Sequence, residues 1–235
     1  MERGAPGPPG LMAGIPPGLE YLTQIDQLVC KQKVEVAQLL TGCEFNNEYS
    51  VKNSMGQEVY RVREDTDCLM RICCANARGF LLRVLDNRNQ EVMRIWREFK
   101  CCAGCCWCAN LNCCAFEVAV EAPPGNVVGY ARQRQSSWCI DLEVLSADRQ
   151  RIFLVNGPCC PCGCGDVHFP VMDASGQTGV GMIMKQWGGC LKESCTTAEN
   201  FSVSFPLDLE VRMKATLLGA LFLIDFMAFE RQNNG

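Results

Sequence analysis

Histidine is nearly missing from this sequence of 235 residues, which contains only His168. Serine and cysteine nucleophiles need a nearby base, and no Gly-rich nucleophile turn accompanies this histidine, so we interpret it as an ordinary residue at a strand edge. The phosphate-binding P-loop and the dinucleotide-binding pattern GxGxxG are absent as well. The sequence therefore predicts no catalytic centre, and any zinc site would consist almost entirely of thiolates.

Positive charge is also scarce. The chain has 22 Lys and Arg residues against 26 Asp and Glu residues, which gives a net charge of −4 and a pI near 5.2. Nucleic-acid binding depends on basic side chains that neutralise phosphates. We therefore expect no nucleic-acid partner unless the fold creates a local basic patch.

The N-terminus lacks the apolar segment of a secretory signal peptide, and residues 1–18 are instead rich in Pro and Gly. We interpret them as a short flexible tail, with docking of the prolines to SH3 or WW domains as the less favoured alternative. Synthesis in the cytosol would keep thiols reduced. The 19 cysteines are then expected to bind metal, carry lipid or pack as small hydrophobes, and not to form disulfides.

A recurring unit dominates the chain from residue 49 onward: an alternating strand, a polar turn that ends in Gln, and a second alternating strand. Asn, Asp, Ser and Gly supply the turn geometry, and the period of two places Val, Ile and Leu on one face. The turns are expected at residues 53–57, 86–90, 146–150 and 173–177, with another at residues 123–126. Successive hairpins predict one antiparallel sheet that closes into a barrel and so loses its edges. Residues 19–40 fit either a strand pair or a short helix.

Residues 215–229 break this pattern because they are apolar all round apart from Thr216 and Asp225. A helix without a polar face must be buried, in protein or in lipid. At ~1.5 Å per residue it would reach roughly 22 Å, less than the ~30 Å of a bilayer core. Length therefore favours a helix inside the barrel, and Asp225 needs a partner in either setting. The side chains expected to form this barrel-core or membrane helix are Leu217, Leu218, Leu221, Phe222, Ile224, Asp225 and Phe226.

Cysteine is the one abundant reactive residue, and it clusters. Clustered cytosolic cysteines are typical substrates of palmitoylation, and two or more acyl chains give stable membrane anchoring. Zinc is the alternative, with C-x2-C spacing in two places, and burial of structural thiols is a third. The expected acylation sites are Cys101, Cys102, Cys105, Cys106, Cys108, Cys113 and Cys114; the alternative zinc ligands are Cys105, Cys108, Cys159 and Cys162.

A segment from Thr197 to Asp208 can be aligned with a calcium-binding EF-hand loop. Position 1 of such a loop is usually Asp but is Thr197 here, and the turn glycine is replaced by Ser202. Without the alignment, the alternating apolar residues of this segment predict a strand. The ligand positions would be Thr197, Glu199, Phe201, Val203, Phe205 and Asp208.

Several strings together resemble the phospholipid scramblase family in order and spacing over nearly the whole chain. The most specific are Phe205–Lys214 (FPLDLEVRMK) and Phe222–Glu230 (FLIDFMAFE), and the cysteine run, Ala122–Tyr130 and Lys185–Gly188 also contribute. The resemblance implies a tubby-like fold, an antiparallel barrel around the hydrophobic C-terminal helix. It divides the chain into the tail 1–18, the domain 19–230 with its helix 215–229, and a polar tail 231–235.

The resemblance also implies ATP-independent, calcium-stimulated, bidirectional movement of phospholipids between leaflets. It implies palmitate on the cysteine run and a cytosol-facing domain at the plasma membrane, single-pass type II if the helix spans, with homo-oligomers as a further expectation. The family's calcium loop corresponds to Thr197–Asp208, and its basic nuclear-import stretch to Gly181–Trp187, where only Lys185 is basic. Relative to the family, Ala103, Gly104 and Trp107 interrupt the cysteine run. The rival hypotheses are a palmitoylated adaptor that transports nothing and a zinc-dependent interaction or DNA-binding module.

Overall fold

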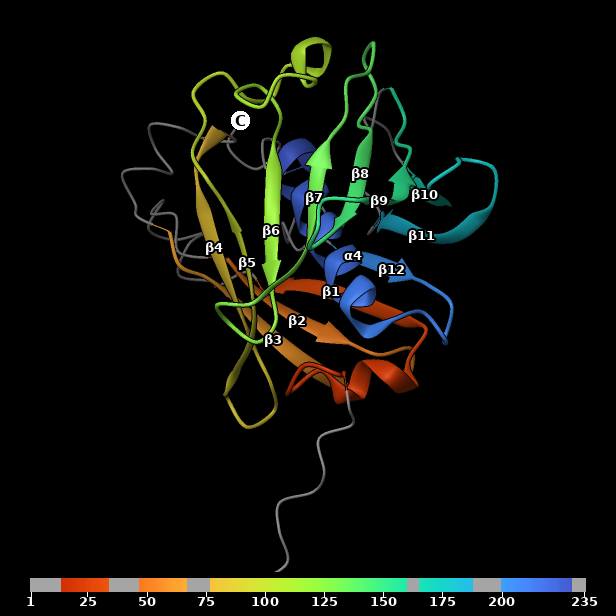
Figure 1. The fold of residues 1–235 in the computed structure, drawn as a ribbon. Coiled ribbons are helices and arrows are strands. Elements are labelled where there is room, and N and C mark those ends of the chain that lie inside the picture. Colours follow the sequence, from red (N-terminus) through yellow and green to blue (C-terminus); the bar gives the residue numbers. More distant parts are fainter. Residues whose placement is uncertain (1–13, 34–46, 67–76, 160–164, 188–199, 230–235) are drawn as a thin grey trace, which may run out of the picture.

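The computed structural model describes residues 14–33, 47–66, 77–159, 165–187 and 200–229. Within these ranges, twelve antiparallel strands close into a barrel around a single α-helix (Figure 1). Each strand pairs with its neighbour in sequence, and β1 pairs with both β2 and β12, which closes the sheet. The strands are β1 (Gln27–Lys33), β2 (Glu48–Lys52), β3 (Glu58–Glu64), β4 (Phe80–Leu85), β5 (Glu91–Arg97), β6 (Glu117–Glu121), β7 (Val127–Gln133), β8 (Leu142–Ser146), β9 (Arg151–Val155), β10 (Val167–Asp173), β11 (Gly179–Gln186) and β12 (Asn200–Ser204).

All five predicted hairpins are confirmed, and the recurring Gln has a structural reason. In each of the four repeated turns, the first side chain accepts a hydrogen bond from the backbone N–H of that Gln. The bonds are Gln57 to Asn53, Gln90 to Asp86, Gln150 to Ser146 and Gln177 to Asp173, at 2.8–3.2 Å. The residue just before the Gln has a positive φ in every case: Gly56, Asn89, Arg149 and Gly176. The repeat is therefore one turn geometry, encoded by an acceptor at its start and a left-handed residue near its end.

The undecided N-terminal segment contains both kinds of structure. A short 3-10 helix, η1 (Glu20–Gln24), precedes strand β1. The rest of that segment lies outside the described residues.

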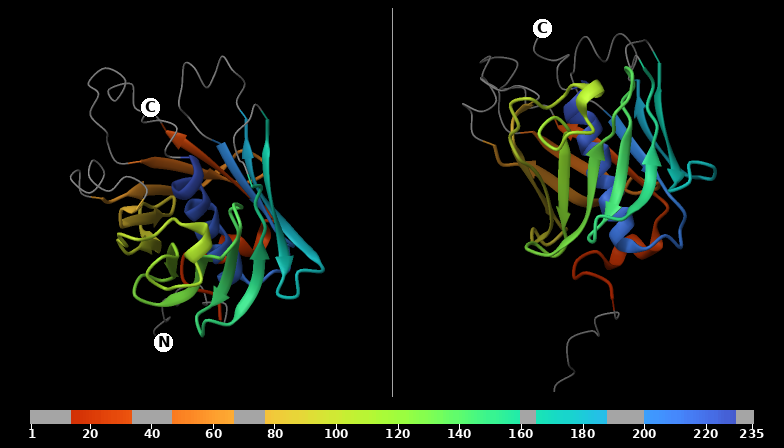
Figure 2. Two further views of the ribbon diagram at one scale, coloured as in Figure 1. Left: turned by 90° about the horizontal axis from the view of Figure 1, so that it is seen from above. Right: turned by 45° about the horizontal axis from the view of Figure 1, so that its top comes forward.

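The helix α4 (Val211–Ile224) fills the barrel and continues into a π-helical turn, η4 (Asp225–Phe229). Every residue of α4 except Arg212 is buried, and Figure 2 shows the helix enclosed by the strands. Of the two environments that the sequence left open, the structure thus shows the barrel interior. In the part of the chain that the structure describes, no helix has both the length and the apolar character needed to cross a membrane.

The predicted start of the helix at residue 215 was wrong by four residues, because Lys214 is buried inside it. The Lys214 ammonium donates hydrogen bonds to the carbonyl oxygens of Leu22, Ile25 and Leu207, at 2.9, 2.8 and 2.7 Å. Burial lowers the pKa of Lys214, and the negative charges of Asp208 and Asp26 oppose this shift. One side chain therefore ties the end of η1, the turn after β12 and the first helical turns together.

We predict that Lys214→Met destabilises the fold by several kcal/mol. The change leaves three inward carbonyl oxygens without their donor, and each unsatisfied buried group costs about 1–3 kcal/mol. Lys31→Met, at an exposed position of β1, is the matched control and should change stability by less than about 0.5 kcal/mol. Chemical denaturation of the two variants checks this, and equal midpoints would contradict the assigned role of Lys214.

The helix packs closely against β7 because Gly129 has no side chain. A Cβ at this position would lie 2.5 Å from Thr216 Oγ1 and 2.7 Å from the carbonyl oxygen of Leu145. A backbone oxygen cannot move aside without disturbing the β7–β8 ladder, in which Gly129 pairs with Ser146. The helix can therefore sit at this depth only with glycine at position 129.

We predict that Gly129→Ala lowers the unfolding free energy by about 1–3 kcal/mol, the usual cost of overpacking. Gly179→Ala, in β11, is the control because its Cβ would meet nothing within 4 Å. Thermal unfolding followed by circular dichroism should show a lower melting temperature for the first variant alone. A drop of the same size in both variants would mean that contact with the helix is not the cause.

Candidate functional site

The barrel has two unlike ends. The five hairpin turns and the start of α4 lie at one end, which we call the turn end. At the opposite end, the loop end, lie the connection between β5 and β6 (residues 98–116), the connection between β7 and β8 (residues 134–141) and the last residues of η4. Figure 2 (right) shows these longer connections together at the top of the view. The predicted acylation sites are all in the first of them, so the loop end is the candidate functional site.

The cysteines of this loop are mostly open to solvent. Cys101, Cys102, Cys105 and Cys113 are exposed, Cys106 and Cys108 are partly exposed, and Cys114 is buried. A short 3-10 helix, η3 (Cys106–Cys108), places several of them on one turn. Six of the seven predicted acylation sites are therefore accessible to a modifying enzyme, and Cys114 is the exception.

Cys105 differs from its neighbours in its electrostatics. Hydrogen bonds from the Cys108 thiol and from the backbone N–H groups of Cys108 and Trp107 lower the pKa of Cys105. The pKa of Cys102 and Cys108 is raised, in each case chiefly by the thiol hydrogen bond to its partner cysteine, and the pKa of Cys114 rises to about 11 for the same reason. Since the thiolate is the nucleophile, Cys105 is the most reactive of these four.

One pair of cysteines corrects the expectation that none would be oxidised. Cys139, in the β7–β8 connection, forms a disulfide with Cys159, just after β9. The physical reason is the hairpin: Leu142 pairs with Val155 across β8 and β9, so residues just beyond these strand ends lie side by side. A rule based on the average cytosolic thiol could not reveal this proximity.

The alternative zinc ligands that the structure describes lie on different segments of the barrel's loop end. Cys108 lies on η3 and Cys105 directly precedes it, whereas Cys159 bonds to Cys139 and Cys162 lies outside the described residues. Among the residues that the structure describes, no group of three or more His, Cys, Asp or Glu side chains could hold a metal ion.

The calcium alignment falls partly on β12. Thr197 and Glu199 lie outside the described residues, Phe201 and Val203 are buried in β12, Phe205 is buried after it, and Asp208 is exposed in the turn before α4. In β12, Phe201 pairs with Cys30 on one side and Lys185 on the other. A strand held on both sides runs straight, whereas an EF-hand loop wraps around its ion. The predicted strand is confirmed here, and the calcium loop stays a prediction, since Thr197 and Glu199 lie outside the described residues.

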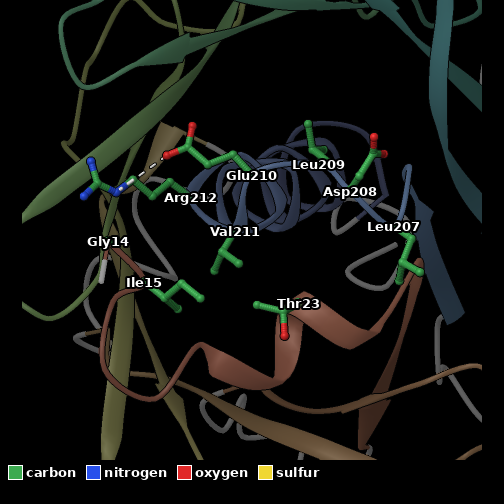
Figure 3. Close-up of a pocket in the computed structure, with 9 residues that line it drawn as sticks. All are labelled: Gly14, Ile15, Thr23, Leu207, Asp208, Leu209, Glu210, Val211 and Arg212. Carbon is green, nitrogen blue, oxygen red and sulfur yellow. Dashed lines mark ion pairs between the residues drawn. The ribbon is translucent and has the colours of Figure 1, made fainter. Parts of the chain in front are cut away.

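Asp208 instead lines a cavity of about 380 Å³ at the turn end, between η1 and the start of α4 (Figure 3). Glu210 also lines it and pairs with Arg212 at 3.8 Å. The N-terminus of a helix favours anions, but the two carboxylates repel them. These opposing preferences single out no ligand class for this cavity.

The loop end contains the partner that Asp225 requires. Asp225 is 5% exposed and accepts a hydrogen bond of 2.9 Å from the Tyr49 hydroxyl. Nearby, the Arg78 guanidinium forms a buried ion pair with Glu64 at 3.1 Å and lies over the Phe226 ring. The last helical turn is thus held by polar contacts with the barrel wall.

Comparison with known proteins finds relatives over nearly the whole chain. The scramblase family model matches residues 5–231. Phospholipid scramblase 1 of Rattus norvegicus is 47% identical over 231 residues, which cover 98% of this chain and 67% of the relative. Phospholipid scramblase 1 of Homo sapiens is 46% identical over 227 residues, 96% of this chain and 69% of the relative.

The chain belongs to the scramblase family. Phospholipid scramblase family member 5 of Homo sapiens is also similar, at 39% identity over 222 residues, which cover 94% of this chain and 80% of the relative. No solved structure matches the chain.

The stretch expected to correspond to the family's nuclear-import signal, Gly181–Trp187, lies in strand β11 up to Gln186. Its one basic residue, Lys185, lies over the Phe229 ring at 4.0 Å from the ring centre. The side chain is thus engaged with the helix end that the barrel encloses.

Sequence patterns did not indicate two features of this structure. Lys214 was treated as a residue preceding the helix, and no sequence pattern indicates its three carbonyl partners. Trp138 was not singled out, although it packs against Trp107 in an edge-to-face pair with ring centres 5.0 Å apart. The only signal was the presence of Trp107 within the cysteine run.

We predict that Cys105 is alkylated faster than Cys102, Cys108 and Cys114 at pH values below the ordinary thiol pKa of about 8.5. Its lowered pKa leaves more thiolate at a given pH, so its reaction rate should reach half of its maximum at a lower pH. Iodoacetamide labelling with peptide mass spectrometry checks this. Cys105→Ser should remove the fast phase, whereas the control Cys101→Ser should keep it; loss of the phase in Cys101→Ser would contradict the assignment.

Proposed function

We propose that this protein is a phospholipid scramblase of the plasma membrane that moves phospholipids in both directions between leaflets without ATP. The observation that carries the proposal is the match of 98% of the chain to a protein named phospholipid scramblase 1. Equilibration of lipids between leaflets is downhill, so the activity needs a path for polar headgroups and no coupled energy source. The expected absence of a catalytic centre is compatible with this.

Acylation of the cysteine loop is the proposed means of membrane attachment. The exposed thiols of Cys101, Cys102, Cys105 and Cys113 support it. A single acyl chain binds a membrane only marginally, and two or more give stable anchoring. Several palmitates on this loop would hold the loop end of the barrel against the cytosolic leaflet.

The enclosed helix restricts how transport can occur. Because α4 fills the barrel, we infer that headgroups do not pass through the barrel interior and that transport takes place outside it, where several copies of the protein crowd together. Homo-oligomers are therefore part of the proposal. Calcium stimulation is a further part that rests on the family resemblance alone, since the described residues from Asn200 to Asp208 form a strand and a turn.

We predict that the purified protein in liposomes exposes inner-leaflet fluorescent phospholipids to an external quencher. Calcium should speed this exposure, and Asp208→Ala should weaken the calcium effect because this carboxylate is the described acidic position of the aligned loop. Asp148→Ala, an exposed carboxylate in the β8–β9 turn, is the matched control and should behave as wild type. Rates of quenching with and without calcium provide the measurement.

Each result has a distinct meaning. Exposure that is independent of calcium would retain transport and exclude the aligned loop as a sensor. A protein that binds the liposomes but exposes no lipid above empty vesicles would contradict the proposal and favour the acylated adaptor.

A further inference from the structure

Exposed apolar side chains are concentrated at the loop end. Among the described residues, the exposed large hydrophobic side chains are Met55, Phe99, Trp107, Leu111, Trp138 and Leu207. Phe99, Trp107 and Leu111 are in the β5–β6 connection and Trp138 is in the β7–β8 connection. Two adjoining connections thus carry four of the six, and such concentration usually marks a contact surface.

The two indoles are the core of this surface, and the fold holds them in place. Trp107 is 58% exposed and Trp138 is 69% exposed, although their rings pack edge to face. The Trp107 Nε1–H donates to the carbonyl oxygen of Ser137, and the Ser136 backbone N–H donates to the carbonyl oxygen of Cys106 at 3.2 Å. The disulfide between Cys139 and Cys159 fixes the second connection further. Two large aromatic side chains are therefore presented to solvent on linked loops.

The polar groups around the indoles suit the boundary between lipid and water. Trp107, Trp138, Gln135, Ser136 and Ser137 line an open hollow of about 640 Å³. Tryptophan prefers the interface of a bilayer, where its ring is in apolar surroundings and its N–H remains among polar groups. Amide and hydroxyl groups beside the rings can then bond to lipid carbonyl and headgroup oxygens.

The charge of this surface fits an anionic leaflet. Glu98, at the start of the β5–β6 connection (residues 98–116), is the one acidic residue in it. Lys100 donates to the carbonyl oxygens of Asn112 and Ala115, and Arg132 donates to that of Asn110, so two cations border the loop. The flanking carboxylates Glu117 and Asp141 are paired with Arg149 at 2.9 Å and with Arg134 at 3.2 Å. Basic side chains close to an anionic surface favour binding.

We propose that Trp107 and Trp138, with Leu111 of the β5–β6 connection, insert into the interface of an anionic bilayer and orient the barrel with its loop end toward the membrane. The proposal rests on the proposed membrane location and adds an anchor that requires no acyl chain. Trp107 and the thiols of Cys101, Cys102 and Cys105 belong to the same connection, and Trp138 packs against Trp107 from the neighbouring one. Insertion of the rings therefore holds these thiols at the surface where acyl chains enter the bilayer.

The test uses the full chain after hydroxylamine treatment, so that no thioester-linked acyl chain contributes. The protein is mixed with vesicles of phosphatidylcholine and phosphatidylserine that carry bromine, a tryptophan quencher, at shallow or deep acyl positions. Wild-type fluorescence should be quenched more by shallow bromine than by deep bromine. In the double variant Trp107→Ser/Trp138→Ser, which keeps the partly buried Trp96 and Trp187, shallow quenching should fall relative to wild type. Vesicle binding should fall by about tenfold or more, which corresponds to at least about 1.4 kcal/mol.

The matched control replaces exposed apolar residues at the turn end, Met55→Ser/Leu207→Ser, and should bind vesicles as wild type does. An unchanged melting temperature in both double variants shows that each is folded. Equal vesicle binding by the tryptophan variant and wild type would overturn the proposal, as would loss of binding in the turn-end control. A change from dimer to monomer in the tryptophan variant without a change in vesicle binding would also overturn it, because the patch would then be an interface between copies.

The bromine-quenching experiment and the lipid-exposure experiment test the two proposals separately, so either proposal can be rejected while the other stands. Shallow quenching without lipid exposure keeps the tryptophan anchor and rejects transport. Lipid exposure without shallow quenching keeps transport and rejects the anchor.

Discussion

The structure depends on the enclosure of one helix that is apolar on every side. Such a helix has no face that water can cover, so it requires a barrel that is closed all round. The pairing of β1 with β12 provides this closure, and β12 directly precedes the helix in the chain. Truncating one buried Leu or Phe costs about 2–5 kcal/mol, whereas a whole domain is stable by only about 5–15 kcal/mol. The helix therefore cannot leave while the empty barrel persists, and any membrane-inserted form of the helix would need an unfolded or refolded barrel.

Two charged residues fix how far the helix enters. Lys214 meets three carbonyl oxygens near the turn end, and Asp225 meets the Tyr49 hydroxyl near the loop end. A shift of one helical turn would separate both groups from their partners at once, and a buried polar group without a partner is costly. An apolar helix alone could slide within an apolar barrel, so these polar contacts determine its register where hydrophobic burial cannot.

The features that the sequence predicted are local ones. The hairpins were predictable because each turn is encoded within five residues, from the acceptor at its start to the Gln at its end. The helix start was not, because Lys214 looks like a flanking charge until η1 and the turn after β12 are folded beside it. The disulfide and the packing of Trp107 on Trp138 join segments that are about twenty to thirty residues apart, and only the barrel's topology brings them together. The expectation that all cysteines are reduced was wrong for Cys139 and Cys159, because their proximity also depends on the barrel's topology.

The asymmetry between the barrel ends bears on how such a protein could act on lipids. Turns held by their own side chains close one end, while the other end gathers thiols, indoles and basic groups on two linked connections. With the interior occupied by α4, a membrane can be contacted through the loop end and the outer wall alone. If the proposed anchor holds, the barrel rests on one leaflet without spanning it. Transport would then arise from disturbance of that leaflet, by insertion of rings and acyl chains and by crowding of several copies, and should depend on how densely the protein covers the surface.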